Sequence, residues 1–323
     1  MAKIGGHKPQ KRDTGRAQTL ATKPAIVVSV HGQFVKVKDD NGRIHRVRTR
    51  HKLPPLASGD NVEFAAERGS GSIESLQPRR SLLTRSDAHG SPRPVAANID
   101  LVLIVWAPLP PTPAGFIDRY LVNLELQQLT AVLVGSKSDR AEPANAAARE
   151  LMRTRYRAIG YEWHDISVVT DEGLAQLTER LSGQTTAIVG QSGVGKSSLV
   201  NALSPQDAPQ LHQQIGPLTS NEAHGTHTTS ATRLLHLDNG CVVIDSPGVR
   251  DFATGHLSGT SLADGFPEMR ERAPKCRFRD CMHQREPDCA VQHALANGDI
   301  DPARMASYAA MLVESLAFEA EHF

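Results

Sequence analysis

A glycine-rich segment at residues 190–198, GQSGVGKSS, has the spacing of a nucleotide phosphate-binding loop. It fits G-x-x-x-x-G-K-[ST] and lies between an apolar, strand-like run and the helix-like run 198–203, which is the context this motif requires. Glycines let successive main-chain N–H groups face phosphate oxygens, Lys196 neutralises the β- and γ-phosphates, and Ser197 offers a hydroxyl to Mg²⁺. We therefore predict phosphate binding by this loop. Its members are Gly190, Gln191, Ser192, Gly193, Val194, Gly195, Lys196, Ser197 and Ser198.

Two further segments could complete a site for Mg²⁺ and a γ-phosphate. A strand-like run ends in DSPG, where Asp245 is placed to hold Mg²⁺ and the N–H of Gly248 to bond a γ-phosphate. The Thr-rich loop that begins at 225, GTHTT, offers Thr228 or Thr229 as a ligand that orders the loop when the γ-phosphate is present. An Asp-Pro-Gly turn and a solvent-exposed connection are the structural alternatives.

The run AVLVGSKSD at 131–139 has the form of a buried strand that ends in a base-reading loop. Its Asp139 carboxylate can accept from guanine N1–H and the 2-amino group together, which adenine cannot offer. The Lys137 stem would cover the face of the ring. We assign Ser136, Lys137, Ser138 and Asp139 to base binding.

A second loop, which begins at Ser167 after the strand-like run 161–166, could meet the other side of the base. The side chain of Ser167 and the N–H of Val168 are placed to contact guanine O6. Each base loop is a weak signal alone, but the order of all five loops is informative. It is base loop, Ser loop, phosphate loop, Thr loop and D-x-x-G, which is the GTPase order cyclically permuted.

A cluster of cysteines and a histidine, C-x4-C-x-H-x5-C at 276–289, has metal-ligand spacing. Three sulfurs and one imidazole suit a closed tetrahedral Zn²⁺ site of the structural kind. Because the segment has little apolar content, the metal would supply folding energy that a core cannot. The predicted zinc ligands are Cys276, Cys281, His283 and Cys289; redox or disulfide use is the alternative.

The elements that must position these residues fall into three regions. Residues 1–23 are basic and polar and predict a disordered tail, and 24–94 predict short strands in an OB-like barrel with a linker. Apolar runs alternating with helix-length stretches over 95–254 predict an α/β domain with a parallel sheet covered on both faces. Residues 255–323 predict a small α-rich zinc domain that ends in a helix.

Charge is distributed unevenly along the 323 residues. Residues 1–93 carry 18 Lys and Arg against 8 Asp and Glu, whereas the whole chain has a net charge of +1. A row of arginines at 43–50 could follow a phosphate backbone, while stacking aromatics are few, Phe34 and Phe64. A basic domain of this kind predicts a nucleic-acid partner; a solvated basic face is the alternative.

Composition also limits the setting of the chain. No apolar run approaches the 18 or more residues of a membrane span, and the N-terminal 20 residues lack the apolar core of a secretory signal. Three of the four cysteines are clustered, which favours a metal site in a reducing compartment over a disulfide scaffold. We expect a cytoplasmic protein with no membrane association.

The motifs GQSGVGKSSLVN, G-x-HTT, DSPGVRDF and C-x4-C-x-H-x5-C together resemble those of the circularly permuted ribosome-assembly GTPases of bacteria, the RsgA or YjeQ family. The resemblance covers nearly the whole chain. It implies GTP hydrolysis stimulated by the small ribosomal subunit late in its maturation, with rRNA contacts through the barrel and zinc domains. We expect GTP and GDP as ligands, Mg²⁺ and one zinc ion as cofactors, and a monomer.

Two positions depart from what the resemblance leads us to expect, and a third departs from many GTPases. Ser136 stands where the family has asparagine, and Val168 where alanine is usual, so we expect weaker nucleotide affinity with guanine preference retained. Val249 replaces the glutamine that orients water in many GTPases, which predicts slow intrinsic hydrolysis. His227 is then the candidate for the missing group. The predicted catalytic residues are Lys196, His227, Thr228, Thr229 and Gly248.

Two other functions fit part of the pattern. One is an ATP-dependent P-loop enzyme acting on a small substrate, which competition between GTP and ATP would distinguish. The other is a zinc-containing RNA-binding module whose nucleotide pocket does not hydrolyse, which absence of turnover with small subunits would favour.

Overall fold

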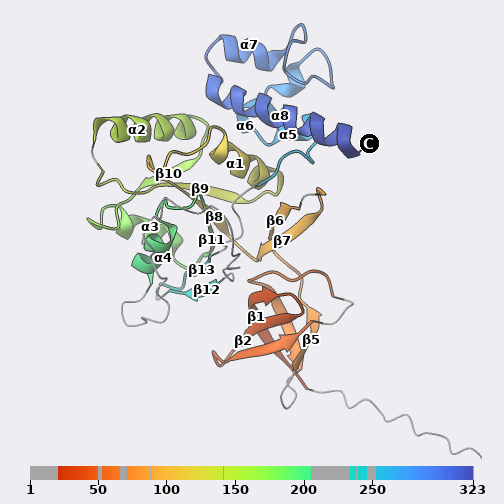
Figure 1. Cartoon of the computed structure of the whole chain (residues 1–323), viewed down its shortest axis with the longest axis vertical. Helices are drawn as coiled ribbons and strands as arrows, with labels where there is room; N and C mark the ends of the chain where they lie inside the picture. Colours follow the sequence, from red (N-terminus) through yellow and green to blue (C-terminus); the bar gives the residue numbers. More distant parts are fainter. Residues whose placement is uncertain are drawn as a thin grey trace, which may run out of the picture.

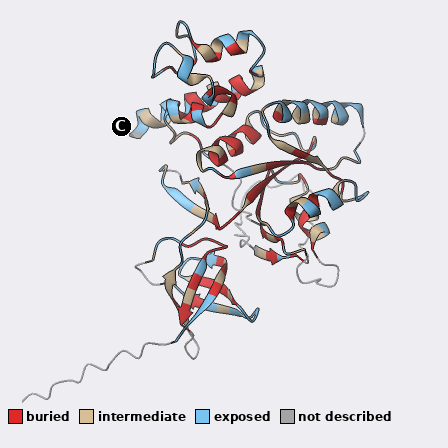
Figure 2. Ribbon diagram, turned by 180° about the vertical axis from the view of Figure 1, so that it is seen from behind, coloured by how far each residue is buried: buried red, intermediate tan, exposed pale blue. Residues whose placement is uncertain are grey.

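The computed structural model describes residues 21–49, 53–65, 71–87, 89–140, 142–204, 233–237, 239–245 and 252–322, with the main chain alone at Arg233, Asp245 and His322. Three regions follow one another along the chain, from a barrel through a central sheet to a helical C-terminal domain (Figure 1). Buried residues gather inside the barrel, along the central strands and on the inward faces of the helices (Figure 2).

The N-terminal region is a closed five-stranded barrel, as predicted. Its strands β1 (Thr22–His31), β2 (Phe34–Asp39), β3 (Ile44–Arg48), β4 (Asn61–Ala65) and β5 (Gly71–Leu76) pair in the order β1-β2-β3-β5-β4. Alternation along the strands buries Val35, Val37 and Val47 in the barrel core. Two details differ from the prediction. The first strand begins inside the expected tail, and Phe64 is fully buried, so it is a core residue and no stacking surface.

The segment predicted as a linker contains a hairpin instead. Strands β6 (Leu82–Ser86) and β7 (Pro92–Ala97) form a two-stranded sheet between the barrel and the C-terminal domain (Figure 1). Gly59 lies in the left-handed region at φ 90°, and a Cβ there would be 2.2 Å from the Ala97 carbonyl oxygen. The missing side chain therefore allows the barrel to pack directly on the end of the hairpin.

The central domain is built on a six-stranded sheet with the order β10-β9-β8-β11-β13-β12. Its strands are β8 (Leu101–Trp106), β9 (Thr130–Gly135), β10 (Glu162–Asp165), β11 (Thr185–Val189), β12 (Arg233–His236) and β13 (Val242–Asp245). Five are parallel, as predicted, but β12 runs antiparallel at the edge. The segment 225–235 is predicted to be a Thr-rich loop, and β12 occupies its end, where Leu234 and Leu235 supply the apolar content.

Helices cover both faces of the sheet. One face packs on α1 (Phe116–Leu126) and α2 (Pro143–Ala158), and the other on α3 (Leu174–Leu181) and α4 (Lys196–Leu203). Alternation along β8 explains the arrangement, because Val102 and Ile104 join the first layer while Leu103 and Val105 join the second. The carboxyl ends of the parallel strands are thereby left free to carry loops.

The C-terminal region is helical, as predicted. It contains α5 (Gly259–Asp264), α6 (Pro267–Arg270), the 3₁₀ helix η2 (Ala273–Lys275), α7 (Ala290–Ala296) and α8 (Pro302–His322). Asp301 caps α8, since its Oδ1 accepts from the Ala303 N–H at 2.7 Å. Among the described helices, none has the length and apolar character needed to cross a bilayer.

A buried ionic network joins this domain to the central one. Arg304 of α8 is fully buried; its guanidinium bonds Asp118 of α1 at 2.7 Å and Glu268 of α6 at 2.7 Å. The hydroxyl of Tyr156 on α2 also donates to Asp118, at 2.7 Å. Four helices from two domains therefore share one network, in which a single guanidinium bonds two carboxylates.

Candidate nucleotide and zinc sites

The predicted nucleotide-binding loops meet at one edge of the sheet. The base loop follows β9, the Ser loop follows β10 and the phosphate loop follows β11, and all three strands are parallel. Asp245 ends β13 and is in register with Ile188 of β11, so its main chain lies beside the strand that leads to the phosphate loop. Strand order thus brings together loops that are far apart in the sequence.

The phosphate loop has the backbone that its glycines predict. Gly190, Gly193 and Gly195 have φ values of 141°, 80° and 105°, which residues other than glycine rarely adopt. At Gly190 a Cβ would be 2.3 Å from the Val105 carbonyl oxygen. Helix α4 begins directly after Gly195, so its unpaired N–H groups open toward the loop.

Lys196, the first residue of α4, turns back over this loop. Its Nζ donates to the carbonyl oxygens of Gly190 at 2.8 Å and Gln191 at 2.7 Å. An ammonium held beside the N-terminus of a helix adds positive charge to a place that already favours anions such as phosphate. The next residue, Ser197, is half-buried at the start of the same helix.

The base loop is attached to the phosphate loop by two side chains. The hydroxyl of Ser136, which is 3% exposed, donates to the Val194 carbonyl oxygen. The Nζ of Lys137 donates to the carbonyl oxygens of Gly193 at 2.6 Å and Leu109 at 2.9 Å. Burial, and to a smaller degree the charge of Arg140, lowers the pKa of Lys137 from its usual value. The link through Ser136 was not anticipated from the sequence, because partners 58 residues apart carry no local signal.

The two base-reading loops also contact each other. The buried hydroxyl of Ser167 donates to Oδ1 of the exposed Asp139 at 2.7 Å. Ser167 Oγ in turn accepts from the N–H groups of Val169 and Thr170. Ser138 points elsewhere, donating to Glu172 Oε2 at 2.6 Å. The carboxylate predicted to read guanine is therefore oriented by the neighbouring Ser loop, while Val168 lies half-buried beside it.

Several predicted residues lie outside the described part of the chain. These are His227, Thr228, Thr229, Gly248 and Val249, and the side chain of Asp245. Their assignments remain predictions.

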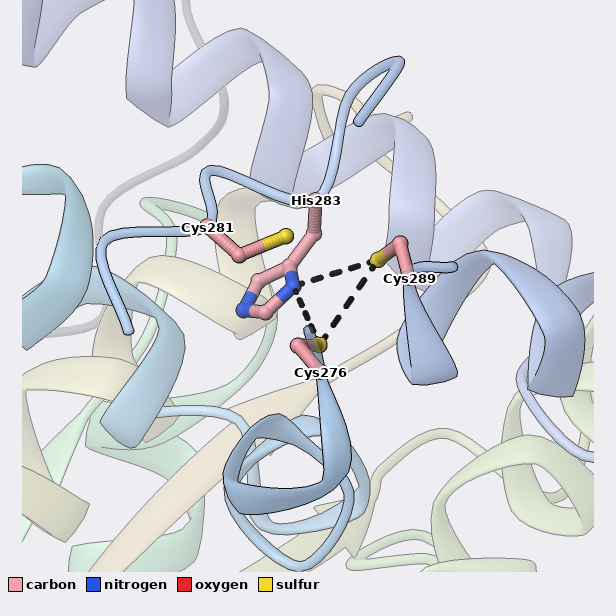
Figure 3. A group of neighbouring side chains, drawn as sticks. All are labelled: Cys276, Cys281, His283 and Cys289. Atoms are coloured by element: carbon pink, nitrogen blue, oxygen red, sulfur yellow. Dashed lines mark hydrogen bonds between the residues drawn. The ribbon is translucent and has the colours of Figure 1, made fainter. Parts of the chain in front are cut away.

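The predicted zinc ligands converge in the C-terminal domain (Figure 3). The ligand atoms of Cys276, Cys281, His283 and Cys289 all lie within 4.8 Å of one another. The sulfurs of Cys276 and Cys289 are 3.9 Å apart, and Zn–S bonds of about 2.3 Å put two tetrahedral ligands about 3.8 Å apart. His283 Nδ1 is 3.4 Å from the Cys289 sulfur. This donor set fits one zinc ion.

The surroundings of the cluster make the charge state of its ligands depend on a bound cation. Burial raises the pKa of Cys281 to about 12 and raises that of Cys289, while burial lowers the pKa of His283. Neutral thiols and a neutral imidazole thus prevail without a metal, and a cation is needed to hold the sulfurs as thiolates. The fourth cysteine, Cys241, is fully buried under the sheet and takes no part.

Comparisons with known proteins identify the family of the chain. Residues 76–255 match the family model described as RsgA GTPase. A Pseudomonas fluorescens protein named small ribosomal subunit biogenesis GTPase RsgA is 40% identical over 93% of this chain and 86% of its own length. A Pseudomonas aeruginosa protein of the same name is 42% identical over 87% of this chain and 82% of its own.

A solved structure shares the architecture as well. The crystal structure of YjeQ from Thermotoga maritima is similar with a TM-score of 0.71 and 31% identity, covering 92% of this chain and 99% of that one. The family model covers more than half of the chain, and the relatives are similar to it over most of its length, which leads to one conclusion. The chain belongs to the RsgA GTPase family.

Proposed function

We propose that this protein is a GTPase that binds the small ribosomal subunit and hydrolyses GTP during that subunit's late maturation. The observation that carries the proposal is the convergence of base loop, Ser loop and phosphate loop in permuted order at one sheet edge. Membership of a family whose curated relatives are named small ribosomal subunit biogenesis GTPases supplies the biological setting. The cytoplasm and a monomeric state go with this assignment.

In the proposed site each loop has a separate role. Main-chain N–H groups of residues 190–198 and Lys196 bind the phosphates, Asp139 and Ser167 select guanine, and Ser197 with Asp245 holds Mg²⁺. Mg²⁺ supplies charge neutralisation along the phosphates. Thr228 or Thr229 and Gly248 sense the γ-phosphate. His227 is the candidate to orient water, because Val249 has no polar group for this task.

The assignment can be tested by following phosphate release from GTP with and without small ribosomal subunits. We expect slow turnover by the protein alone and a large stimulation by subunits, with unlabelled GTP but not ATP as a competitor. His227→Ala should reduce the stimulated kcat with little effect on GDP affinity. Absence of turnover with subunits present contradicts the GTPase assignment, and unchanged stimulated turnover in His227→Ala contradicts that residue's role.

Guanine selection by Asp139 has its own test. Asp139→Asn replaces an acceptor by an amide that can donate to the 2-oxo group of xanthine, so preference should shift from GTP to XTP. Unchanged preference in a competition assay contradicts the base-loop assignment.

We propose that residues 24–94, 95–254 and 255–323 act as RNA-binding, GTPase and zinc-binding domains. On the barrel, the exposed Arg46 and Arg48 flank Phe34, with guanidinium carbons 4.0 and 5.5 Å from its ring centroid. Lys36 of β2 lies opposite Arg46 of β3 in the strand register, which extends the basic face. Such a face suits an RNA backbone, and salt should weaken its binding steeply.

A second basic surface adjoins the zinc cluster. Lys275, Arg277 and Arg279 are exposed around Phe278, which is itself 41% exposed. We propose that both surfaces contact rRNA. Arg46→Glu with Arg48→Glu should weaken association with small subunits and flatten its salt dependence, whereas Arg157→Glu on the exposed side of α2 should not. Equal effects of the two changes would contradict a specific role for the barrel face.

The segment that follows the γ-phosphate loop offers a path between domains. Phe252 packs on Tyr120 of α1 with ring centroids 4.9 Å apart, Thr254 accepts from Arg119, and the Leu257 carbonyl accepts from Ser315 of α8. We propose that hydrolysis moves this segment and with it the zinc domain, which promotes release from the subunit. Identical rRNA crosslinks of the zinc domain with a GTP analogue and with GDP would contradict this coupling.

A further inference from the structure

A buried arginine lies behind the two loops assigned to guanine binding. Arg149 is on α2, the helix that follows the base loop, and it is buried, with 9% of the residue exposed. It is set apart from its helical neighbours, because Arg153 and Arg157 on later turns are half-buried and exposed, respectively. An arginine is rarely buried unless its charge and donors are used.

The guanidinium of Arg149 bonds the main chain of the base loop. Its Nη2 donates to the Lys137 carbonyl oxygen at 2.7 Å and approaches the Ser136 carbonyl oxygen at 3.4 Å. Lys137 has a φ of 59°, a left-handed conformation that is uncommon for a residue with a side chain. A charged donor on the carbonyl of this residue stabilises the loop in the conformation that sends the Lys137 side chain toward the phosphate loop.

The same guanidinium reaches the base of the Ser loop. Arg149 Nε is 3.5 Å from Oδ1 of Asp165, the last residue of β10 and two residues before Ser167. This contact is an ion pair and not a hydrogen bond, since Nε has no hydrogen-bond partner among the described residues. Asp165 is fixed in turn by the indole N–H of Trp163 at 3.0 Å. A Cβ at Gly135 would be 2.6 Å from Asp165 Oδ1, so the carboxylate lies directly against the end of the base-loop strand. One side chain therefore contacts the base loop and the end of the strand that leads into the Ser loop.

We infer that Arg149 is a positioning residue for guanine selection. It holds Asp139 in place through the Lys137 carbonyl of the base loop, and it holds Ser167 in place through the Asp165 carboxylate that precedes the Ser loop. It does not touch the nucleotide. Asp139 depends on both loops for its orientation, because it belongs to the first and accepts a hydrogen bond from Ser167 of the second. The inference rests on the proposed role of Asp139 in reading guanine.

The test compares binding of GDP with binding of IDP. The base of IDP lacks the 2-amino group from which the Asp139 carboxylate would accept a hydrogen bond. Loss of Arg149 should lower the GDP-over-IDP preference, because the 2-amino contact requires correct placement of the carboxylate. In Arg149→Met we expect the GDP Kd to rise about tenfold, the scale of one charged hydrogen bond, and the IDP Kd to rise much less. A general loss of structure would weaken binding of both nucleotides equally and leave the ratio of their Kd values unchanged.

Arg153→Met is the matched control, since Arg153 is one turn along the same helix and also pairs with Asp165, at 3.2 Å, without bonding the base loop. Its GDP-over-IDP ratio should equal that of the wild type. Arg149→Lys keeps the charge and should restore part of the ratio. If Arg149→Met does not fold, as judged by thermal unfolding and zinc content, Arg149→Gln takes its place.

An unchanged ratio in the folded Arg149 variant, or an equal loss in Arg153→Met, overturns the inference. The Asp139→Asn experiment separates this failure from failure of the base-loop assignment. If Asp139→Asn transfers preference to xanthine while the Arg149 variant retains the wild-type ratio, the role of Arg149 is wrong and the guanine site stands. If Asp139→Asn leaves preference unchanged, the guanine site itself is misassigned.

Discussion

The hydroxyl of Ser136 donates a hydrogen bond to the main-chain carbonyl of Val194, which joins the loop after β9 to the loop after β11. The resemblance places asparagine at this position, and the serine predicts weaker nucleotide affinity. The shorter side chain nevertheless reaches the phosphate loop, through its hydroxyl on the Val194 carbonyl. The serine is therefore a connection between base and phosphate binding.

Removing this connection should weaken nucleotide binding. We expect Ser136→Ala to raise the GDP Kd about fivefold, since a buried hydrogen bond contributes about 1 kcal/mol and the Val194 carbonyl would lose its partner. Ser136→Cys, with a weaker donor of similar shape, should be intermediate. Fluorescence titration with a labelled GDP measures both. Wild-type affinity in Ser136→Ala would show that the bond does not contribute.

Zinc should be required for the fold of the C-terminal domain. Cys281→Ser removes one ligand, so we expect loss of the metal and a lower Tm, because metal binding supplies folding energy. Cys241→Ala is the matched control: Cys241 is buried elsewhere, where burial raises the pKa of its thiol to about 11. It should keep one zinc per chain by atomic absorption. Full zinc content in Cys281→Ser would contradict the ligand set.

Breaking the buried network around Arg304 should cost far more than breaking a surface pair. Arg304→Met leaves the carboxylates of Asp118 and Glu268 buried without their cation, which costs about 3–5 kcal/mol. Arg270→Met, which breaks the exposed pair with Glu125, should cost about 1 kcal/mol or less. Urea unfolding measures both free energies. Similar values for the two would mean that the buried network does not stabilise the domain junction.

Acidification should weaken the contact between the hairpin and the C-terminal region. His256 Nε2 is 2.8 Å from the Ser86 hydroxyl, and burial lowers the pKa of His256 below its ordinary value of 6.5. The folded state thus favours the neutral ring, so its contribution is present above pH 6.5 and is lost as the pH falls below that value.

The measurement is the Tm at pH 7.5 and pH 5.5 for the wild type and for His256→Gln. The glutamine cannot titrate, so its Tm should fall less on acidification, while the other histidines act equally in both proteins. An identical fall in the two proteins would exclude His256 as the cause.

Local patterns in the sequence were sufficient for most of the elements and for the sites whose ligands are close together. The phosphate loop and the zinc ligands each occupy fewer than fifteen consecutive residues, and their spacing alone specifies phosphate and metal chemistry. The apolar runs likewise predicted the strands, because fully buried parallel strands carry continuous apolar sequence. The hairpin at 82–97 was missed because its prolines and glycine are equally typical of a linker.

The contacts among the loops depended on tertiary structure. Ser136 and Val194, Ser167 and Asp139, and Arg149 and Asp165 come together because β9, β10 and β11 end at one edge of the sheet. The sequence determined which chemistry each loop carries, since that depends on residue type and local spacing. Only the folded sheet decided which side chains hold those loops in place, because such pairing depends on strand order and on the direction of each buried side chain.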